Sequence, residues 1–143
     1  QVFIEEVKKR CPEVQEFYAD ALTGNEFIKD AVEKSCDADT RIIILFSRLY
    51  SGKGSVGLNE RHIELINQLT EDEIPLLVIS FGSPYFLKHF PDVDIYVCAY
   101  RKAGLAQKAA VRAVFGEIGF SGRLPVSIPD LYELGHGIIM EKK

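Results

Sequence analysis

A cationic, hydroxyl-rich stretch between residues 46 and 58 holds the side chains with the clearest chemical potential. It contains Arg48, Tyr50 and Lys53, several hydroxyl groups, and no Asp or Glu. A guanidinium can bind a carboxylate through two parallel hydrogen bonds, whereas a lysine ammonium acts as a point charge. Open α/β folds bind ligands beyond the carboxyl ends of their parallel strands, and this stretch follows a run of residues typical of a strand. We interpret the three residues as candidate contacts to a ligand or a neighbouring domain; a solvated crossing loop is the alternative.

The same stretch carries a G-x-G-x-x-G pattern, formed by Gly52, Gly54 and Gly57. In dinucleotide-binding folds this pattern directly follows a strand, so that the next helix begins at the pyrophosphate. Here residues 47–51 intervene, and the next predicted strand ends without the carboxylate that would hold a ribose. The pattern therefore does not favour a dinucleotide site, and we predict no cofactor.

The remaining reactive side chains form no catalytic set. His62, His89 and His136 lack partners at metal-ligand spacing, and there is no G-x-S-x-G nucleophile motif. The glycines around His136 predict a tight turn whose middle residue bonds the backbone. Asp92 and Asp94 lead into a strand at its amino end, which is the wrong edge of the sheet for a site. We predict neither a catalytic residue nor a metal ligand within the chain.

Five apolar runs of strand length alternate with helical patterns, and β-branched residues dominate the second of them. A run without polar alternation is typical of a strand buried on both faces. Pro125 removes a ladder donor from the last run, so that this run suits a sheet edge. The five runs are VQEFY (14–18), RIIILF (41–46), PLLVIS (75–80), DIYVCA (94–99) and LPVSI (124–128).

Helical patterns fill the intervals between the runs. Asn25 and Asn59 are placed to cap two helices, and Ser83 followed by Pro84 has the order typical of a helix start. Further helical patterns cover residues 2–10 and the alanine-rich stretch that ends near Gly116. The alternation predicts a three-layer α/β/α sandwich with a mostly parallel, flavodoxin-like sheet, whose last strand lies at an edge and could run antiparallel.

Length and composition bound the class of protein. A chain of 143 residues, 47% of them hydrophobic, is predicted to form one domain, residues 1–143. The net charge of −4 argues against a dedicated nucleic-acid binder, and no apolar run reaches the length of a membrane span. Three widely spaced cysteines indicate neither a zinc site nor a disulfide framework, and they leave the compartment undetermined.

Several segments, in this order and spacing, resemble the C-terminal α/β sandwich domain of glycoside hydrolase family 3. SGRLPVSIP (121–129), near the closing GHG, is the strongest of them. The others are Ala38-Asp39 before the strand 41–46, PLLVISFGSPYFLKHFPDVDIYVCAY (75–100) and QKAAVRAVFGE (107–117). Together they extend the resemblance over essentially all of residues 14–138.

The resemblance implies a two-domain enzyme whose chemistry lies elsewhere. In that family a separate N-terminal (β/α)8 barrel holds the aspartate nucleophile, and the sandwich packs beside the active-site rim. β-Glucosidase members take their acid/base glutamate from the loop equivalent to 46–58, which here contains no carboxylate. The chain is therefore more similar to the β-N-acetylglucosaminidase branch, whose acid/base is a histidine on a barrel loop. The parent is expected to be a retaining exo-glycosidase, and this chain an accessory domain without activity of its own.

The resemblance also implies partners. They are the barrel of the same parent protein and a carbohydrate substrate at the interface between the two domains, with Arg48, Tyr50 and Lys53 as the best candidate contacts. The chain begins at Gln1 within a helical pattern, and the family's first strand is missing, so we expect a fragment. A vacant sheet position would leave an open edge through which copies could associate. A stand-alone flavodoxin-like ligand-binding module is the alternative function.

Overall fold

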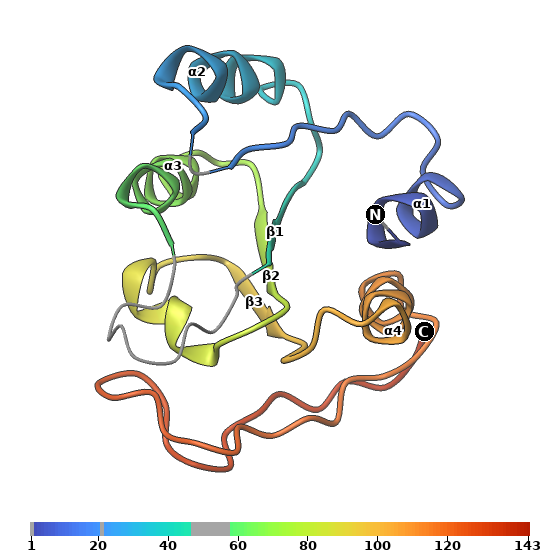
Figure 1. Ribbon diagram of the computed structural model, residues 1–143. Helices are drawn as coiled ribbons and strands as arrows, with labels where there is room; N and C mark the ends of the chain where they lie inside the picture. Colours follow the sequence, from blue (N-terminus) through green and yellow to red (C-terminus); the bar gives the residue numbers. More distant parts are fainter. Residues whose placement is uncertain (1, 21, 47–57) are drawn as a thin grey trace. The chain divides into compact units, whose positions relative to one another are not determined.

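The computed structural model describes residues 2–20, 22–46 and 58–143, which divide into two compact units (Figure 1). One unit is continuous, Phe17–Cys98, and is called the sheet unit below. The other combines Gln1–Glu16 with Ala99–Lys143 and is called the split unit. No helix in the described parts of the chain is long and apolar enough to cross a membrane.

Three parallel strands form the core of the sheet unit. They are β1 (Arg41–Leu45), β2 (Leu76–Ser80) and β3 (Ile95–Cys98), and they lie in the order β1-β2-β3. Every residue of the central strand β2 is buried. An uninterrupted apolar sequence is what a strand covered on both faces requires. The predicted α/β fold with a parallel sheet is thus confirmed.

Helices connect these strands, and their starts follow the predicted capping rules in part. Before α3 (Glu60–Thr70), the Asn59 side chain accepts a hydrogen bond from the Arg61 N–H at 3.0 Å. Before the 3₁₀ helix η1 (Pro84–His89), the Ser83 hydroxyl accepts one from the Tyr85 N–H at 3.2 Å. Both caps are as predicted. The predicted cap at Asn25 is wrong, because α2 (Asn25–Lys34) already includes that residue and Gly24 precedes it without a side-chain bond.

Two predicted strands are wrong, each for lack of a neighbour in the sheet. Residues 14–18 form no strand and span the boundary between the two units. Phe17 instead packs edge-to-face against Phe27 of α2, with ring centroids 6.5 Å apart. Residues 124–128 also lie outside the sheet, because their backbone pairs with 132–136.

The flavodoxin-like winding and the third layer of the predicted sandwich stay predictions. The order of the three strands contains no reversal, and α1 and α4 belong to the split unit.

Two helices far apart in sequence form the centre of the split unit. They are α1 (Val2–Lys8) and α4 (Gly104–Val114), which contact each other. The buried Gln107 side chain accepts a hydrogen bond from the Phe3 N–H at 3.0 Å and donates one to the Lys102 carbonyl at 2.7 Å. Gln107 therefore satisfies one of the orphan N–H groups in the first turn of α1. Leu105, near the start of α4, is exposed.

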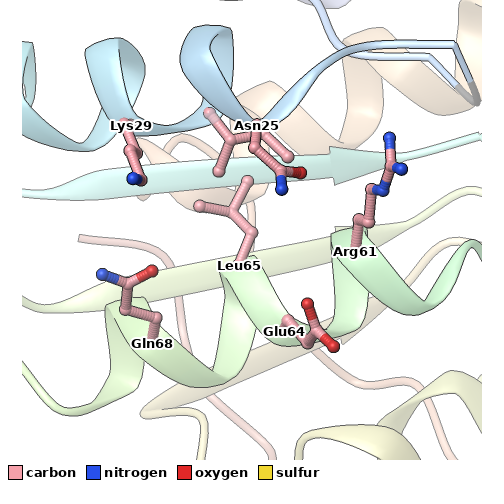
Figure 2. A pocket seen from close by; sticks show the side chains of 7 residues that line it. Asn25, Lys29, Arg61, Glu64, Leu65 and Gln68 are labelled. Carbon is pink, nitrogen blue, oxygen red and sulfur yellow. The ribbon is translucent and has the colours of Figure 1, made fainter.

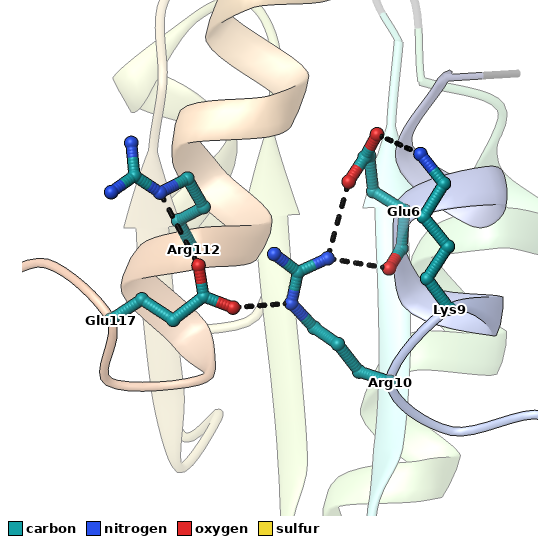
Figure 3. Close-up of polar contacts among 5 residues, drawn as sticks. All are labelled: Glu6, Lys9, Arg10, Arg112 and Glu117. Carbon is teal, nitrogen blue, oxygen red and sulfur yellow. Dashed lines mark hydrogen bonds and ion pairs between the residues drawn. The ribbon is translucent and has the colours of Figure 1, made fainter.

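An ion-pair network joins the end of α1 to the segment after α4 (Figure 3). The Arg10 guanidinium contacts Glu117 at 2.5 Å and Glu6 at 3.2 Å. Lys9 also pairs with Glu6, and Arg112 with Glu117. Hydrogen bonds from Lys9 and then Arg10 lower the pKa of Glu6, and the hydrogen bond from Arg10 lowers the pKa of Glu117.

The network predicts acid sensitivity of the split unit. Because the folded-state pKa values of Glu6 and Glu117 lie below their ordinary value of 4.5, their stabilising contribution is fully present above that pH. It is lost as the pH falls through the lowered folded-state values. We expect Glu117→Gln to flatten the fall in unfolding midpoint below pH 4.5, measured by circular dichroism. Glu141→Gln is the control, since Glu141 forms no ion pair with any described residue. An equal flattening in both variants would contradict the assignment.

The last part of the split unit, residues 116–143, folds back on itself as a long antiparallel arm. Backbone bonds join Phe120 to Met140 in both directions, Leu124 to His136, and Ile128 to Tyr132. The Lys143 N–H closes the base of the arm on the Gly116 carbonyl at 3.0 Å. Gly116, predicted to end the last helix, has a φ of 75° and follows α4 by two residues.

Candidate functional site

The carboxyl edge of the sheet is the part of the described chain where a parallel α/β fold places function. The three strands end in register there, since Leu45 pairs with Ser80 and Ser80 with Cys98. The segment Phe81–Pro84 leaves β2 at this edge and leads directly into η1. This segment therefore lies at the carboxyl edge of the sheet.

Three side chains hold the carbonyl groups of this segment. The Ser80 and Tyr96 hydroxyls each donate a hydrogen bond to the Ser83 carbonyl at 3.1 Å. The Cys98 thiol lies 3.7 Å from the Gly82 carbonyl. Because the donors come from β2 and β3, the segment is fixed to two strands at once. Cys98 is half-buried and acts as a weak donor.

Two aromatic rings stack at the same edge. Phe46, directly after β1, lies on Phe81 with ring centroids 5.2 Å apart and planes 10° from parallel. Phe81 is 1% exposed, whereas Phe46 is 36% exposed. The pair is anchored by the Phe81 N–H, which donates to the Leu45 carbonyl at 2.8 Å. An exposed ring is thus supported from beneath by a buried one.

The predicted contact residues Arg48, Tyr50 and Lys53, like the three glycines of the G-x-G-x-x-G pattern, lie outside the described residues. Their assignment stays a prediction. The described part of the chain ends at Phe46 and resumes at Leu58, so the structure shows only where this stretch leaves and rejoins the sheet unit. It leaves at the carboxyl edge of β1, and it rejoins just before α3.

Three of the other candidate side chains, those of His62, Asp94 and His136, make contacts within the fold. His62 lies 3.1 Å from the Asp20 carbonyl through Nε2, and the Asp94 carboxylate accepts the Leu76 N–H at 2.8 Å. His136 stacks on Tyr132 with ring centroids 4.2 Å apart, and its N–H bonds the Glu133 carbonyl, as a tight turn requires. Within residues 2–20, 22–46 and 58–143, no three His, Cys, Asp or Glu side chains gather as metal ligands would.

Sequence reasoning missed the interactions of Ser80, Tyr96 and Arg41. Ser80 and Tyr96 looked like ordinary strand residues, and only the parallel register brings them to one carbonyl. A serine that ends an otherwise apolar strand was the available signal. Arg41 is a buried cation that pairs with Asp72, while its Nε and Nη2 atoms are buried without a partner in the described structure.

A shallow pocket of about 220 Å³ lies between α2 and α3 (Figure 2). Ile28 and Leu65 contribute its apolar lining, and Lys29 and Arg61 bring two positive charges to its rim. Asn25, Glu64 and Gln68 complete the lining. Ile28 and Leu65 are half-buried and the other five lining residues are exposed, so the pocket is an open groove and its lining holds no desolvated polar group.

The three strands and their helices define an open parallel α/β fold. A comparison with solved structures finds a similar fold in a fungal multi-domain GH3 β-N-acetylglucosaminidase, described as containing a unique GCN5-related glucosamine N-acetyltransferase region. The two chains share 27% sequence identity with a TM-score of 0.75. The likeness covers 95% of this chain and 15% of the fungal chain. No family model and no curated protein matches the sequence.

Proposed function

We propose that the chain is an accessory α/β domain of a family 3 glycoside hydrolase that acts on terminal β-linked sugars, as an exo-β-N-acetylglucosaminidase does. The observation that carries the proposal is the coverage of the likeness: nearly the whole chain matches, but it matches only a small part of a multi-domain glycosidase. The family 3 segments of the sequence, above all SGRLPVSIP, support the same conclusion independently.

In this role the chain contributes no nucleophile and no acid/base. A retaining glycosidase needs two catalytic groups flanking one bond. The domain instead packs beside a (β/α)8 barrel, with the stretch 46–58 directed at the barrel or at a bound carbohydrate. Arg48, Tyr50 and Lys53 would make those contacts, with Arg48 suited to bidentate recognition of a carboxylate.

The proposal predicts an inert chain that associates with a barrel. The purified chain should release no nitrophenol from 4-nitrophenyl N-acetyl-β-glucosaminide above background. It should also raise the melting temperature of a separately expressed family 3 β-N-acetylglucosaminidase barrel. Arg48→Ala with Lys53→Ala should weaken that association by about threefold to tenfold, the value of two exposed ionic contacts. Measurable hydrolysis by the chain alone, or no association with the barrel, would contradict the proposal.

A matched double variant controls for charge. Lys29→Ala with Arg61→Ala removes the same two charges from the groove between α2 and α3. It should leave the association unchanged, because these cations lie on the helices rather than in the stretch 46–58. Equal weakening by the two double variants would indicate a general charge effect and remove the assignment of Arg48 and Lys53.

A second candidate function follows from the description of the fungal protein, which includes a glucosamine N-acetyltransferase region. The same preparation, supplied with acetyl-CoA and glucosamine, distinguishes the two. Release of free CoA would favour the transferase, whereas no release would favour the accessory role. A calorimetric titration with nucleotides and flavins tests the further alternative of a stand-alone ligand-binding module. The absence of binding heat for every compound would contradict that alternative.

A further inference from the structure

Phe46 presents an aromatic surface whose position is fixed by its neighbours. Its ring stacks on Phe81, which is itself almost completely buried, so one face of the Phe46 ring is covered while 36% of the residue stays exposed. Phe17 and Phe27, which have a similar exposure in the sheet unit, meet each other edge-to-face at 73°, and neither is seen stacked on a buried ring in the described residues. The exposed ring at the carboxyl edge is therefore held in one orientation.

A backbone donor lies one residue beyond this pair. Gly82 follows Phe81, is half-buried, and its N–H forms no hydrogen bond with any described residue. A half-buried N–H group gains from an acceptor, because an unpaired backbone donor away from water costs free energy. The Leu45–Phe81 backbone bond sets the register, so Phe46 and Gly82 each lie one position past a bonded pair.

The donor is also held in place before any ligand arrives. Ser80, Tyr96 and Cys98 fix the Gly82 and Ser83 carbonyls, and the Ser83 hydroxyl fixes the start of η1. A preorganised group loses little conformational entropy when a ligand binds. The edge thus combines a partly exposed aromatic ring with a hydrogen-bond donor whose neighbouring carbonyl groups are fixed.

We propose that Phe46 and the Gly82 N–H form a binding platform for a pyranose sugar at the carboxyl ends of β1 and β2. A pyranose has one face of polarised C–H groups, which suits the negative face of an aromatic ring, and a rim of oxygen atoms that accept hydrogen bonds. The Gly82 N–H donates to one of these oxygens while the C–H face lies on Phe46. The choice of a sugar rests on the proposed function; the platform itself rests on the two residues.

The test uses the isolated chain, labelled with ¹⁵N, and methyl N-acetyl-β-glucosaminide as the probe. Addition of millimolar sugar should shift the Gly82 amide resonance, while the amide of Gly24, exposed elsewhere in the sheet unit, stays in place. Saturation transfer from protein to sugar should be seen in the wild type. Phe46→Leu, which keeps an apolar side chain but removes the ring, should lower the affinity by about threefold to tenfold.

Phe27→Leu is the matched control, and it should leave binding unchanged. Phe46→Tyr keeps the ring and should still bind, which decides the question if Phe46→Leu fails to fold. The proposal is overturned by an unmoved Gly82 resonance, by equal loss in Phe27→Leu, or by adenosine shifting Gly82 where the sugar does not. Sugar binding and barrel association are measured in separate experiments. A failure to associate with the barrel would contradict the accessory role without affecting the sugar-binding result, and a failure to bind sugar would contradict the platform without affecting the association result.

Discussion

Replacing Ile79 with Ala is expected to lower the free energy of unfolding by about 2–5 kcal/mol, the range for truncating a fully buried isoleucine. Ile79 lies in β2, the central strand, and is 0% exposed. The substitution removes three methyl(ene) groups and leaves a cavity against one face of the central strand. Urea denaturation followed by circular dichroism measures the loss, with a lower midpoint at an unchanged slope.

Ile95→Ala provides the comparison, because the same residue type lies at the start of β3 in the same sheet but is 51% exposed. We expect a loss below about 1 kcal/mol there, since a half-exposed side chain leaves no closed cavity. Similar losses for the two variants would show that the buried core is not centred on β2.

Replacing Gly137 with Ala is expected to open the antiparallel arm. A Cβ at this position would overlap the Gly122 carbonyl oxygen on the facing strand, and neither group can move aside as a side-chain tip could. The two strands of the arm would have to separate, at a cost of about 1–3 kcal/mol. Amide hydrogen exchange at Leu124 and Met140, which donate across the arm, should accelerate by about 5-fold to 150-fold.

Gly122→Ala is the control within the same arm. A Cβ at Gly122 would meet no atom within 4 Å, and the residue has no positive φ. Exchange at the two reporter amides should therefore stay within about twofold of the wild type, as for a surface change worth under 0.5 kcal/mol. Slow exchange in Gly137→Ala would mean that the arm tolerates the side chain and that its close approach is not required.

The strands whose apolar composition marks them as buried were predictable from the sequence. The strands whose existence depends on pairing with a particular neighbour were not. RIIILF and PLLVIS are apolar without alternation, which leaves few alternatives to buried parallel strands. VQEFY also contains residues that favour strands. A strand, however, forms only where a neighbouring strand pairs with its backbone, and the sequence of these five residues does not specify such a neighbour. LPVSI pairs within residues 116–143 because the turn around Asp130, with a φ of 69°, returns the chain along itself.

The position of the candidate site at the carboxyl edge of the sheet was predictable from the sequence, whereas the side-chain contacts found there were not. The strand-then-loop order indicated function at the carboxyl ends of the strands, and Ser83-Pro84 correctly indicated a helix start. The hydrogen bonds of Ser80 and Tyr96 to one carbonyl depend on the register between β2 and β3, which no local pattern encodes. Phe46 was counted only as the last residue of an apolar run, because stacking on Phe81 is a long-range contact.

The split unit has a consequence for the order of events during synthesis. Phe3 meets Gln107, 104 residues later in the chain, whereas the sheet unit uses only the continuous stretch Phe17–Cys98. A chain emerging from the ribosome completes the sheet unit while α1 still lacks its partner helix. The apolar side chains of α1, Phe3 and Val7, therefore stay without their partner helix until α4 has been synthesised. During that interval the nascent chain exposes apolar surface, which favours aggregation.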